Sequence, residues 1–298
     1  MSLLITGASG MVGTYLKKLL PNAHTPTRKG LDLTNSNDVE EYLWDHKFDY
    51  VIHLAAHVGS LHDNIENRTP YFDNNVLMNT LVTKYAYESG VKNFLGILST
   101  CIYPDNITTF PIHEEQLHNG PPHVDLMSYA YAKRSHAVQL KAYKESYNVN
   151  YNYLIPTNLY GVVSKSHEGR SHFVNDLIFK IIKAQNENKD AIQLFGDGTP
   201  MRQFMHAEDL AKVIQLYYEN NHSASFNVAP DTNMSVHDIA RCALDACGSP
   251  EMKITYDSSK PNGQMRKDVD TTKFKKIYND FKFKSLTSGV KEIYEHYK

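Results

Sequence analysis

The chain has 298 residues, and its 31 lysines and arginines nearly balance 33 aspartates and glutamates, for a formal net charge of −2. This balance lacks the basic patch expected of a protein that binds nucleic acid or an anionic membrane surface. The length is sufficient for one large α/β domain, or two closely joined ones, with a buried core. We therefore expect a partner that is a small molecule.

The cysteines are Cys101, Cys242 and Cys247, an odd number at spacings that fit neither a disulfide framework nor a CxxC metal site. The first ten residues, MSLLITGASG, lack the charged and long apolar segments of a signal peptide. No apolar run approaches the ~20 residues of a membrane span. We expect a cytoplasmic protein.

Fifteen histidines raise the question of a metal site. His53, His57 and His62 straddle a predicted strand end and a loop, so they do not share a helical face, and no cysteine accompanies them. We expect no metal.

In the first half of the chain, short apolar runs alternate with longer segments of helical periodicity. Strands are predicted at residues 3–6, 50–55, 94–99 and 151–155, and helices at 12–20, 38–46, 79–88 and 129–147. Ser36 or Asn37 is the expected cap of the second helix. This alternation is typical of βαβ units. It predicts an α/β fold with a Rossmann-type doubly wound parallel sheet over residues 1–161.

Beyond Gly161 the pattern loosens, with a helix predicted at 172–185 and a strand at 192–195. We expect residues 162–298 to form a smaller α/β substrate-binding lobe, within which the chain crosses back to the sheet. No linker rich in Pro or Ser separates the halves. Because open α/β sheets bind ligands outside the carboxyl ends of their strands, the cleft between the lobes is the expected site.

The run Gly7-Ala8-Ser9-Gly10-Met11-Val12-Gly13 follows the first strand and opens the first helix. Glycines allow a tight turn and a close approach of the backbone to a pyrophosphate, whose charge meets free N–H groups at the helix start. The pattern predicts a dinucleotide site.

Arg28 and Lys29 follow a second predicted strand at 23–27, where an NAD-binding protein has an acid for the ribose hydroxyls. Two cations suit a 2′-phosphate instead, which favours NADP(H). The alternative is an ordinary solvated basic turn. Asp32 and Leu33 are placed to flank the adenine.

Tyr129 and Lys133 stand four residues apart on one face of a predicted helix. A nearby ammonium, together with a positive nicotinamide, would lower the phenol's pKa so that Tyr129 could exchange a proton with a carbonyl oxygen. Ser99 ends a predicted strand, and its hydroxyl could hold the same carbonyl. Tyr131 is the adjacent competitor.

Cys101 lies beside that hydroxyl. A lone cysteine is most often a small buried apolar residue. Next to a ketone site, its thiol could instead remove a proton from the carbon alpha to the ketone, and His172 could return one from the other face. His167 is a nearby alternative to His172, which could also simply begin a helix.

The chain resembles the GDP-L-fucose synthases, extended short-chain dehydrogenase/reductases that epimerise GDP-4-keto-6-deoxy-mannose at C3 and C5 and then reduce C4 with NADPH. The resemblance runs from the glycine turn to near residue 261. Its motifs are His53-Leu54-Ala55-Ala56 with Val58-Gly59, Ser99-Thr100-Cys101-Ile102-Tyr103-Pro104, Tyr129-Ala130-Tyr131-Ala132-Lys133, Pro156-Thr157-Asn158-Leu159-Tyr160-Gly161 and Gly198-Thr199-Pro200-Met201-Arg202-Gln203-Phe204-Met205-His206.

The resemblance implies catalytic roles for Ser99, Tyr129 and Lys133 in reduction and for Cys101 and His172 in epimerisation. The residues implied for NADP(H) are Gly7, Gly10, Met11, Val12, Gly13, Arg28, Asp32, Leu33, Leu54, Ala55, Ala56, Leu98, Tyr129, Lys133, Pro156, Asn158, Leu159 and His172. Those implied for a GDP-linked 4-keto-6-deoxy sugar are Thr100, Asn158, Lys180, Phe195, Arg202 and Asn262. A homodimer is also implied, in which the helix after Asn79 and the Tyr129 helix pair across the interface, with Tyr85, Tyr87 and Tyr143 on their exposed faces.

Three departures from the family lie where the substrate should bind. The segment after Gly161 lacks the usual Asp-Asn-Phe loop, Phe195 stands for the frequent Trp, and Asn262 for the usual Asp. They leave a second hypothesis open, a C4-reductase without epimerisation that acts on a GDP-4-keto-6-deoxy-heptose or a related sugar nucleotide. A 4,6-dehydratase would have acids where Cys101 and Ile102 stand. A non-catalytic NADP-binding module is the remaining alternative.

Overall fold

A computed structural model describes residues 1–163, 173–260 and 262–298, so the predicted His172 lies outside the described residues. A five-stranded parallel sheet has the order β1-β2-β3-β4-β9. Its strands are β1 (Leu3–Thr6), β2 (Tyr50–His53), β3 (Asn93–Ile97), β4 (Asn150–Pro156) and β9 (Phe226–Val228).

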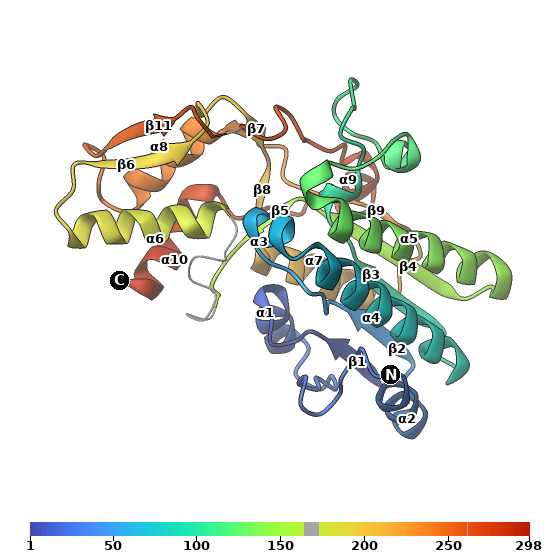
Figure 1. Cartoon of the computed structure of the whole chain (residues 1–298). Helices are drawn as coiled ribbons and strands as arrows, with labels where there is room; N and C mark the ends of the chain where they lie inside the picture. Colours follow the sequence, from blue (N-terminus) through green and yellow to red (C-terminus); the bar gives the residue numbers. More distant parts are fainter. Residues whose placement is uncertain (164–172, 261) are drawn as a thin grey trace.

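Helices cover both faces of this sheet (Figure 1). On one face α1 (Met11–Leu19) and α7 (Ala207–Glu219) bury Leu16 and Ile214 against Leu3 and Ile5 of β1. On the other, α2 (Ser36–His46), α4 (Arg68–Glu88) and α5 (Met127–Tyr147) pack in the cluster that contains Leu4. Alternate side chains of one strand thus enter different cores, as a strand's two-residue period requires. The doubly wound parallel sheet is confirmed, and α7 and β9 from the second half of the chain are part of it.

Three local predictions were wrong. The helix α2 is capped by Asn35, whose Oδ1 accepts hydrogen bonds from Asn37 N at 3.0 Å and Asp38 N at 3.4 Å, rather than by Ser36 or Asn37. The strand predicted at 23–27 is reduced to one bridge between His24 and Leu4. Helix α4 begins at Arg68, eleven residues before the predicted start. The pattern did not predict these first turns, because they bury Tyr71 and Asn75 rather than a stripe of apolar side chains.

The remaining elements form a lobe beside the carboxyl edge of the sheet (Figure 1). Its core lies between α6 (Phe173–Asn186), α8 (Val236–Ala246), α10 (Leu286–Tyr297) and the parallel pair β6 (Ala191–Phe195) and β11 (Lys253–Asp257). Two short pairs connect it to the sheet, β5 (Asn158–Tyr160) with β8 (Phe204–His206) and β7 (Met201–Arg202) with β10 (Met234–Ser235). The other short helices are α3 (Leu61–Glu66), α9 (Thr272–Ile277), η1 (Thr100–Ile102), η2 (Glu114–His118) and η3 (Val124–Leu126). Within the described ranges, every helix is too short or too polar to cross a membrane.

Candidate active site

A cavity of about 610 Å³ lies at the carboxyl ends of the sheet strands. It is lined by the turn between β1 and α1, the segments that follow β2 and β3, the end of β4 and the first turns of α5. This is the place where open α/β sheets bind ligands.

The glycine turn leaves room only for backbone. Gly7 has φ +71°, and a Cβ there would lie 2.6 Å from Ala55 N. A Cβ on Gly13 would lie 2.4 Å from Gly7 O. Gly10 is the N-cap of α1 and provides no side-chain cap, so N–H groups at the start of the helix are available to an anion. The turn fits the pyrophosphate of a dinucleotide.

Every described residue that the resemblance implied for the cofactor lines this cavity, from Gly7 to Leu159. Arg28 is exposed at the cavity wall near Asp32. The Oδ1 atom of Asp32 accepts hydrogen bonds from Thr34 N at 2.9 Å and Thr34 Oγ1 at 2.7 Å, which lower the pKa of this carboxyl. Asp32 therefore stabilises the turn in which it lies. Arg28 is the cation available to a 2′-phosphate.

Lys133 and Tyr129 both line the cavity from α5. Lys133 is only 2% exposed, its Nζ donates to the carbonyl of Ile97 at 2.8 Å, and burial lowers its pKa to about 8. Burial, followed by the side chains of Cys101 and Tyr71, raises the pKa of Tyr129 well above its ordinary value. The predicted lowering of this pKa requires the positive nicotinamide as well as Lys133, so it stays a prediction for the cofactor complex; in the protein alone, desolvation raises the pKa. Tyr131, the alternative to Tyr129 as the proton-transferring tyrosine, is 37% exposed and does not line the cavity.

Ser99 and Cys101 line the same cavity at the end of β3. The Ser99 hydroxyl accepts a hydrogen bond from Cys101 N at 3.4 Å and caps η1. Cys101 is buried, and desolvation raises the pKa of its thiol, although Lys267, Ser99 and Lys133 act to lower it. The thiol is thus placed beside the Ser99 hydroxyl with cations nearby.

Lys267 also lines the cavity and was not predicted from the sequence. Burial lowers its pKa, and the charges of Cys101 and Arg202 both act on it. Tyr71, Asn74 and Phe173 also line the cavity and were not predicted. Because Lys267 lies far along the chain in an irregular segment, no periodic pattern connects it to Cys101.

The residues predicted for the substrate fall into separate groups. Asn158 lines the cavity, whereas Thr100 is buried in η1 and does not line it. On the lobe, Lys180 Nζ lies 5.3 Å from the ring centroid of Phe195, which is 63% exposed.

Asn262 holds the turn that follows Phe195. Its Oδ1 accepts a hydrogen bond from Asp197 N at 2.9 Å, next to Gly196 with φ +77°. Arg202 on β7 is partly buried, which lowers its pKa, and it lies near Lys267. Arg202 therefore adds a second cation near Lys267, whereas Lys180 lies beside Phe195 on the lobe.

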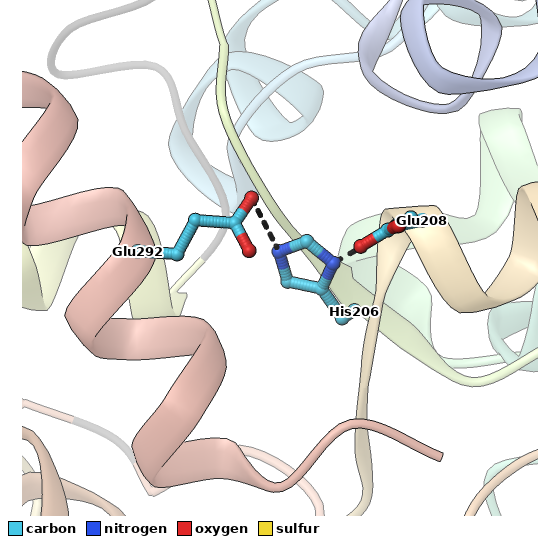
Figure 2. Close-up of side chains that lie close together, drawn as sticks. All are labelled: His206, Glu208 and Glu292. Atoms are coloured by element: carbon cyan, nitrogen blue, oxygen red, sulfur yellow. Dashed lines mark hydrogen bonds and ion pairs between the residues drawn. The ribbon is translucent and has the colours of Figure 1, made fainter. Parts of the chain in front are cut away.

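A separate cluster joins the end of β8 to α10 (Figure 2). His206 Nε2 lies 3.8 Å from Glu292 Oε1, and its Nδ1 accepts a hydrogen bond from Glu208 N at 3.3 Å. One potential metal-ligand atom from each of His206, Glu208 and Glu292 lies within 4.8 Å of the others. The Nζ atom of Lys284 lies 2.6 Å from Glu208 Oε2 and 2.5 Å from Glu292 Oε2. Since the ammonium already binds both carboxylates, the cluster is a salt-bridge network between the sheet and the lobe.

The sheet and its glycine-lined cavity define a Rossmann-type dinucleotide-binding protein. The model of the NAD dependent epimerase/dehydratase family matches residues 3–229, and the chain belongs to this family.

Two named relatives and one solved structure align with this protein over nearly its whole length. The GDP-L-fucose synthase of Dictyostelium discoideum is 34% identical over 98% of this chain and 93% of its own. The GDP-L-colitose synthase of Yersinia pseudotuberculosis is 31% identical over 100% and 98%. The crystal structure of a GDP-L-fucose synthetase from Naegleria fowleri bound to NADP superposes with a TM-score of 0.88 at 29% identity, covering 99% of this chain and 91% of that one.

Proposed function

We propose that this protein is an NADP(H)-dependent enzyme that reduces the C4 ketone of a GDP-linked 4-keto-6-deoxy sugar after epimerising C3 and C5. The observation that carries the proposal is that Ser99, Cys101, Tyr129 and Lys133 line one cavity together with the glycine turn. Relatives at 31–34% identity named GDP-L-fucose synthase and GDP-L-colitose synthase, which match nearly the full chain, support a GDP-sugar substrate.

Gly7, Gly10 and Gly13 would hold the pyrophosphate of the cofactor, and Arg28 would bind its 2′-phosphate. Bound NADPH supplies a hydride for C4. The choice of NADP(H) over NAD(H) rests on Arg28, since a guanidinium forms paired, charge-assisted hydrogen bonds with a phosphate. The relative bound to NADP supports the same choice.

Tyr129 is the proton donor to the ketone oxygen. Its phenol stays protonated because burial raises its pKa, so the proton is available when the ketone becomes an alkoxide. Ser99 donates a second hydrogen bond to that oxygen, and the Lys133 ammonium stabilises the phenolate that is left.

Epimerisation requires a base and an acid on opposite faces of the sugar ring. Cys101 is the proposed base, beside Ser99 and within the field of Lys267, which favours the thiolate. The proposed acid, His172, lies outside the described residues. The base would remove the proton alpha to the ketone, and the acid would return one from the other side.

A second candidate is a C4-reductase without epimerisation, acting on a GDP-4-keto-6-deoxy-heptose or a related sugar nucleotide. It is favoured by the raised pKa of the buried Cys101 thiol. A thiol that keeps its proton is a poor base, while reduction by Tyr129 and Lys133 does not require it.

The nucleotide diphosphate is proposed to lie along a path from Lys267 in the cavity, past the nearby Arg202, to Lys180 on the lobe. Phe195 offers an exposed ring to the base at the end of that path. All three side chains are cations that can answer the two phosphates.

We also propose a homodimer that pairs α4 and α5 of two copies. The prediction that Tyr85 lies on an exposed face is wrong: its side chain is only 6% exposed and packs in the core cluster that contains residues of α2. The exposed large apolar side chains of the two helices are instead Phe72 and Leu77 on α4 and Met127, Tyr131, Val138 and Tyr147 on α5. Three free cysteines suit a cytoplasmic location, where thiols stay reduced.

The test is incubation with GDP-4-keto-6-deoxy-mannose in D2O, with and without NADPH, following deuterium at C3 and C5 by mass spectrometry. Deuterium incorporation without NADPH that disappears in Cys101→Ser supports the epimerase. NADPH oxidation with no deuterium at either carbon favours the reductase alone. Absence of both would overturn the proposal for this substrate.

A further inference from the structure

His53 ends β2 beneath the candidate active site, with its ring completely buried. Both ring nitrogens have partners. Nδ1 lies 2.7 Å from Thr6 Oγ1 on β1, and Nε2 lies 3.1 Å from Asn79 Oδ1 on α4. His53 thus joins a strand and a helix through a single side chain.

The direction of each hydrogen bond follows from the neighbours. Asn79 Nδ2 donates to the carbonyl of Ala132 at 3.3 Å, so Asn79 Oδ1 is the acceptor and His53 Nε2 carries the proton. His53 Nδ1 is then an acceptor for the Thr6 hydroxyl, whose oxygen in turn accepts from Ala55 N at 3.3 Å. The result is one continuous ladder from Ala55 through Thr6, His53 and Asn79 to Ala132.

The two ends of this ladder of hydrogen bonds lie at the two parts of the site, the cofactor-binding segment and the helix that carries Lys133. Ala55 lines the cavity, and its backbone is what a Cβ on Gly7 would strike. Ala132 precedes Lys133, whose ammonium is fixed on Ile97 O. We infer that His53 is a positioning residue, which sets the spacing between the cofactor-binding segment at Ala55 and the helix that carries Tyr129 and Lys133. The inference rests on the proposed function.

The charge of His53 is suited to this role. Burial, followed by the nearby positive charge of Lys133, lowers its pKa to about 3, so the ring is neutral throughout the working pH range. A neutral ring keeps one donor and one acceptor, which the ladder requires, and it does not repel the ammonium of Lys133. The other ionisable ring against it is His136, 5.6 Å away and edge-on, also buried and neutral because burial lowers its pKa.

Two conservative replacements separate the halves of the ladder. In His53→Asn, the amide oxygen takes the place of Nδ1 and keeps the bond to Thr6, but the side chain is too short for Asn79. In His53→Gln, the amide nitrogen takes the place of Nε2 and keeps the bond to Asn79. Thr6→Val and Asn79→Leu remove the same two links without touching His53. His136→Gln is the matched control, because His136 is equally buried on α5 but bonds to Thr83 at 3.1 Å, outside the ladder.

The measurements are the Kd of NADPH by fluorescence, the kcat at saturating NADPH, and the thermal unfolding of each variant. We expect His53→Gln and Thr6→Val to raise the Kd about tenfold with kcat changed less than about threefold, the scale of one buried hydrogen bond. His53→Asn and Asn79→Leu should lower kcat about tenfold with the Kd nearly unchanged. His136→Gln should change neither.

Equal loss of kcat and affinity in all five variants, in proportion to their loss of stability, would show that His53 only supports packing and would overturn the inference. If the wild-type protein fails to reduce any 4-keto GDP-sugar, the proposed function fails separately. The Kd measurements still decide the inference in that case: the increase must occur in His53→Gln and Thr6→Val and be absent in His136→Gln.

Discussion

Lys133 directs its ammonium at the carbonyl of Ile97, 2.8 Å away, at the carboxyl end of β3. This bond fixes the lysine on the same strand end that presents Ser99, so the helix residues and the strand hydroxyl share one frame. The lysine is almost fully buried, and desolvation lowers its pKa to about 8 from an ordinary 10.5. The protonation of this one group therefore has consequences for both activity and stability.

Reduction should decline above about pH 8 with a slope of one proton, because deprotonated Lys133 no longer stabilises the Tyr129 phenolate. The measurement is kcat for the C4 reduction between pH 6.5 and 10. A rate that stays constant to pH 9.5 would contradict the assignment of Lys133.

Stability should change with pH in the opposite direction. Between pH 8 and 10.5 the unfolded chain binds the lysine proton and the folded chain does not, so the free energy of unfolding rises with pH through this window. Lys133→Met lacks this gain. The difference in unfolding free energy, wild type minus variant, should rise by up to about 3 kcal/mol from pH 8 to 10.5 in urea titrations. A constant difference would show that Lys133 has an ordinary pKa.

Arg28→Ala should weaken NADPH binding by about 10- to 100-fold, the scale of lost charge-assisted hydrogen bonds to a phosphate. NADH, which has no 2′-phosphate, should bind to the Arg28→Ala variant with nearly the same affinity as to the wild type. Lys29→Ala is the control, since Lys29 is exposed beside Arg28 but does not line the cavity. Kd values for both cofactors decide, and equal weakening of NADH and NADPH would exclude a role at the 2′-phosphate.

Gly13→Ala should abolish dinucleotide binding and lower the free energy of unfolding by about 3 kcal/mol, because the new Cβ would meet the backbone at 2.4 Å from Gly7 O. Gly30→Ala is the matched control, with its Cβ at an ordinary 3.6 Å from Thr27 O. Calorimetric melting and NADPH titration of both variants test this. A stable Gly13→Ala protein that binds NADPH would show that the turn is less tight than described.

The features predicted from sequence are those set by local periodicity. The glycine turn, the ends of the sheet strands and the Tyr129 helix are each encoded within about 20 residues, and their parallel order brings them to one edge of the sheet. The early start of α4 was missed because Asn75 is buried by hydrogen bonds to His57 N and O rather than by apolar contact. Polar burial of this kind leaves no hydrophobic period.

The residues that the lobe contributes to the site show a second limit of prediction from the sequence. Lys267 reaches the cavity from an irregular segment, and only the tertiary fold brings it near Cys101. Desolvation is equally invisible in sequence: burial raises the pKa of Tyr129, an effect that the spacing of Tyr129 and Lys133 does not reveal. Motif spacing identifies which groups meet, but burial determines their charge.

Lys284→Met should destabilise the protein by about 2 kcal/mol, because Glu208 and Glu292 would lie near each other without their shared cation. Lys212→Met is the control, since Lys212 is 43% exposed and also binds Glu208; it should cost less than about 0.5 kcal/mol.

The effect of Lys284 should also depend on pH. Its hydrogen bond lowers the pKa of Glu208 to about 2 from 4.5, so this stabilisation is complete above pH 4.5 and is lost as pH falls toward 2. The difference between wild type and Lys284→Met in urea should therefore shrink below pH 4.5. A difference that is independent of pH would mean that packing of the lysine stem, rather than its charge, holds the lobe.

Leu77→Glu and Val138→Glu should each convert a dimer into monomers. Leu77 is 45% exposed on α4 and Val138 52% exposed on α5, and these two helices pack side by side, so a charge on either would be buried without a partner at a paired face. Trp44→Glu is the control, because Trp44 is 47% exposed on α2, away from that face. Sedimentation velocity measures the result. If Leu77→Glu and Val138→Glu sediment as the wild type does while Trp44→Glu dissociates, the interface is formed by α2 instead of α4 and α5. A wild-type protein that sediments as a monomer would show that this apolar face does not mediate self-association.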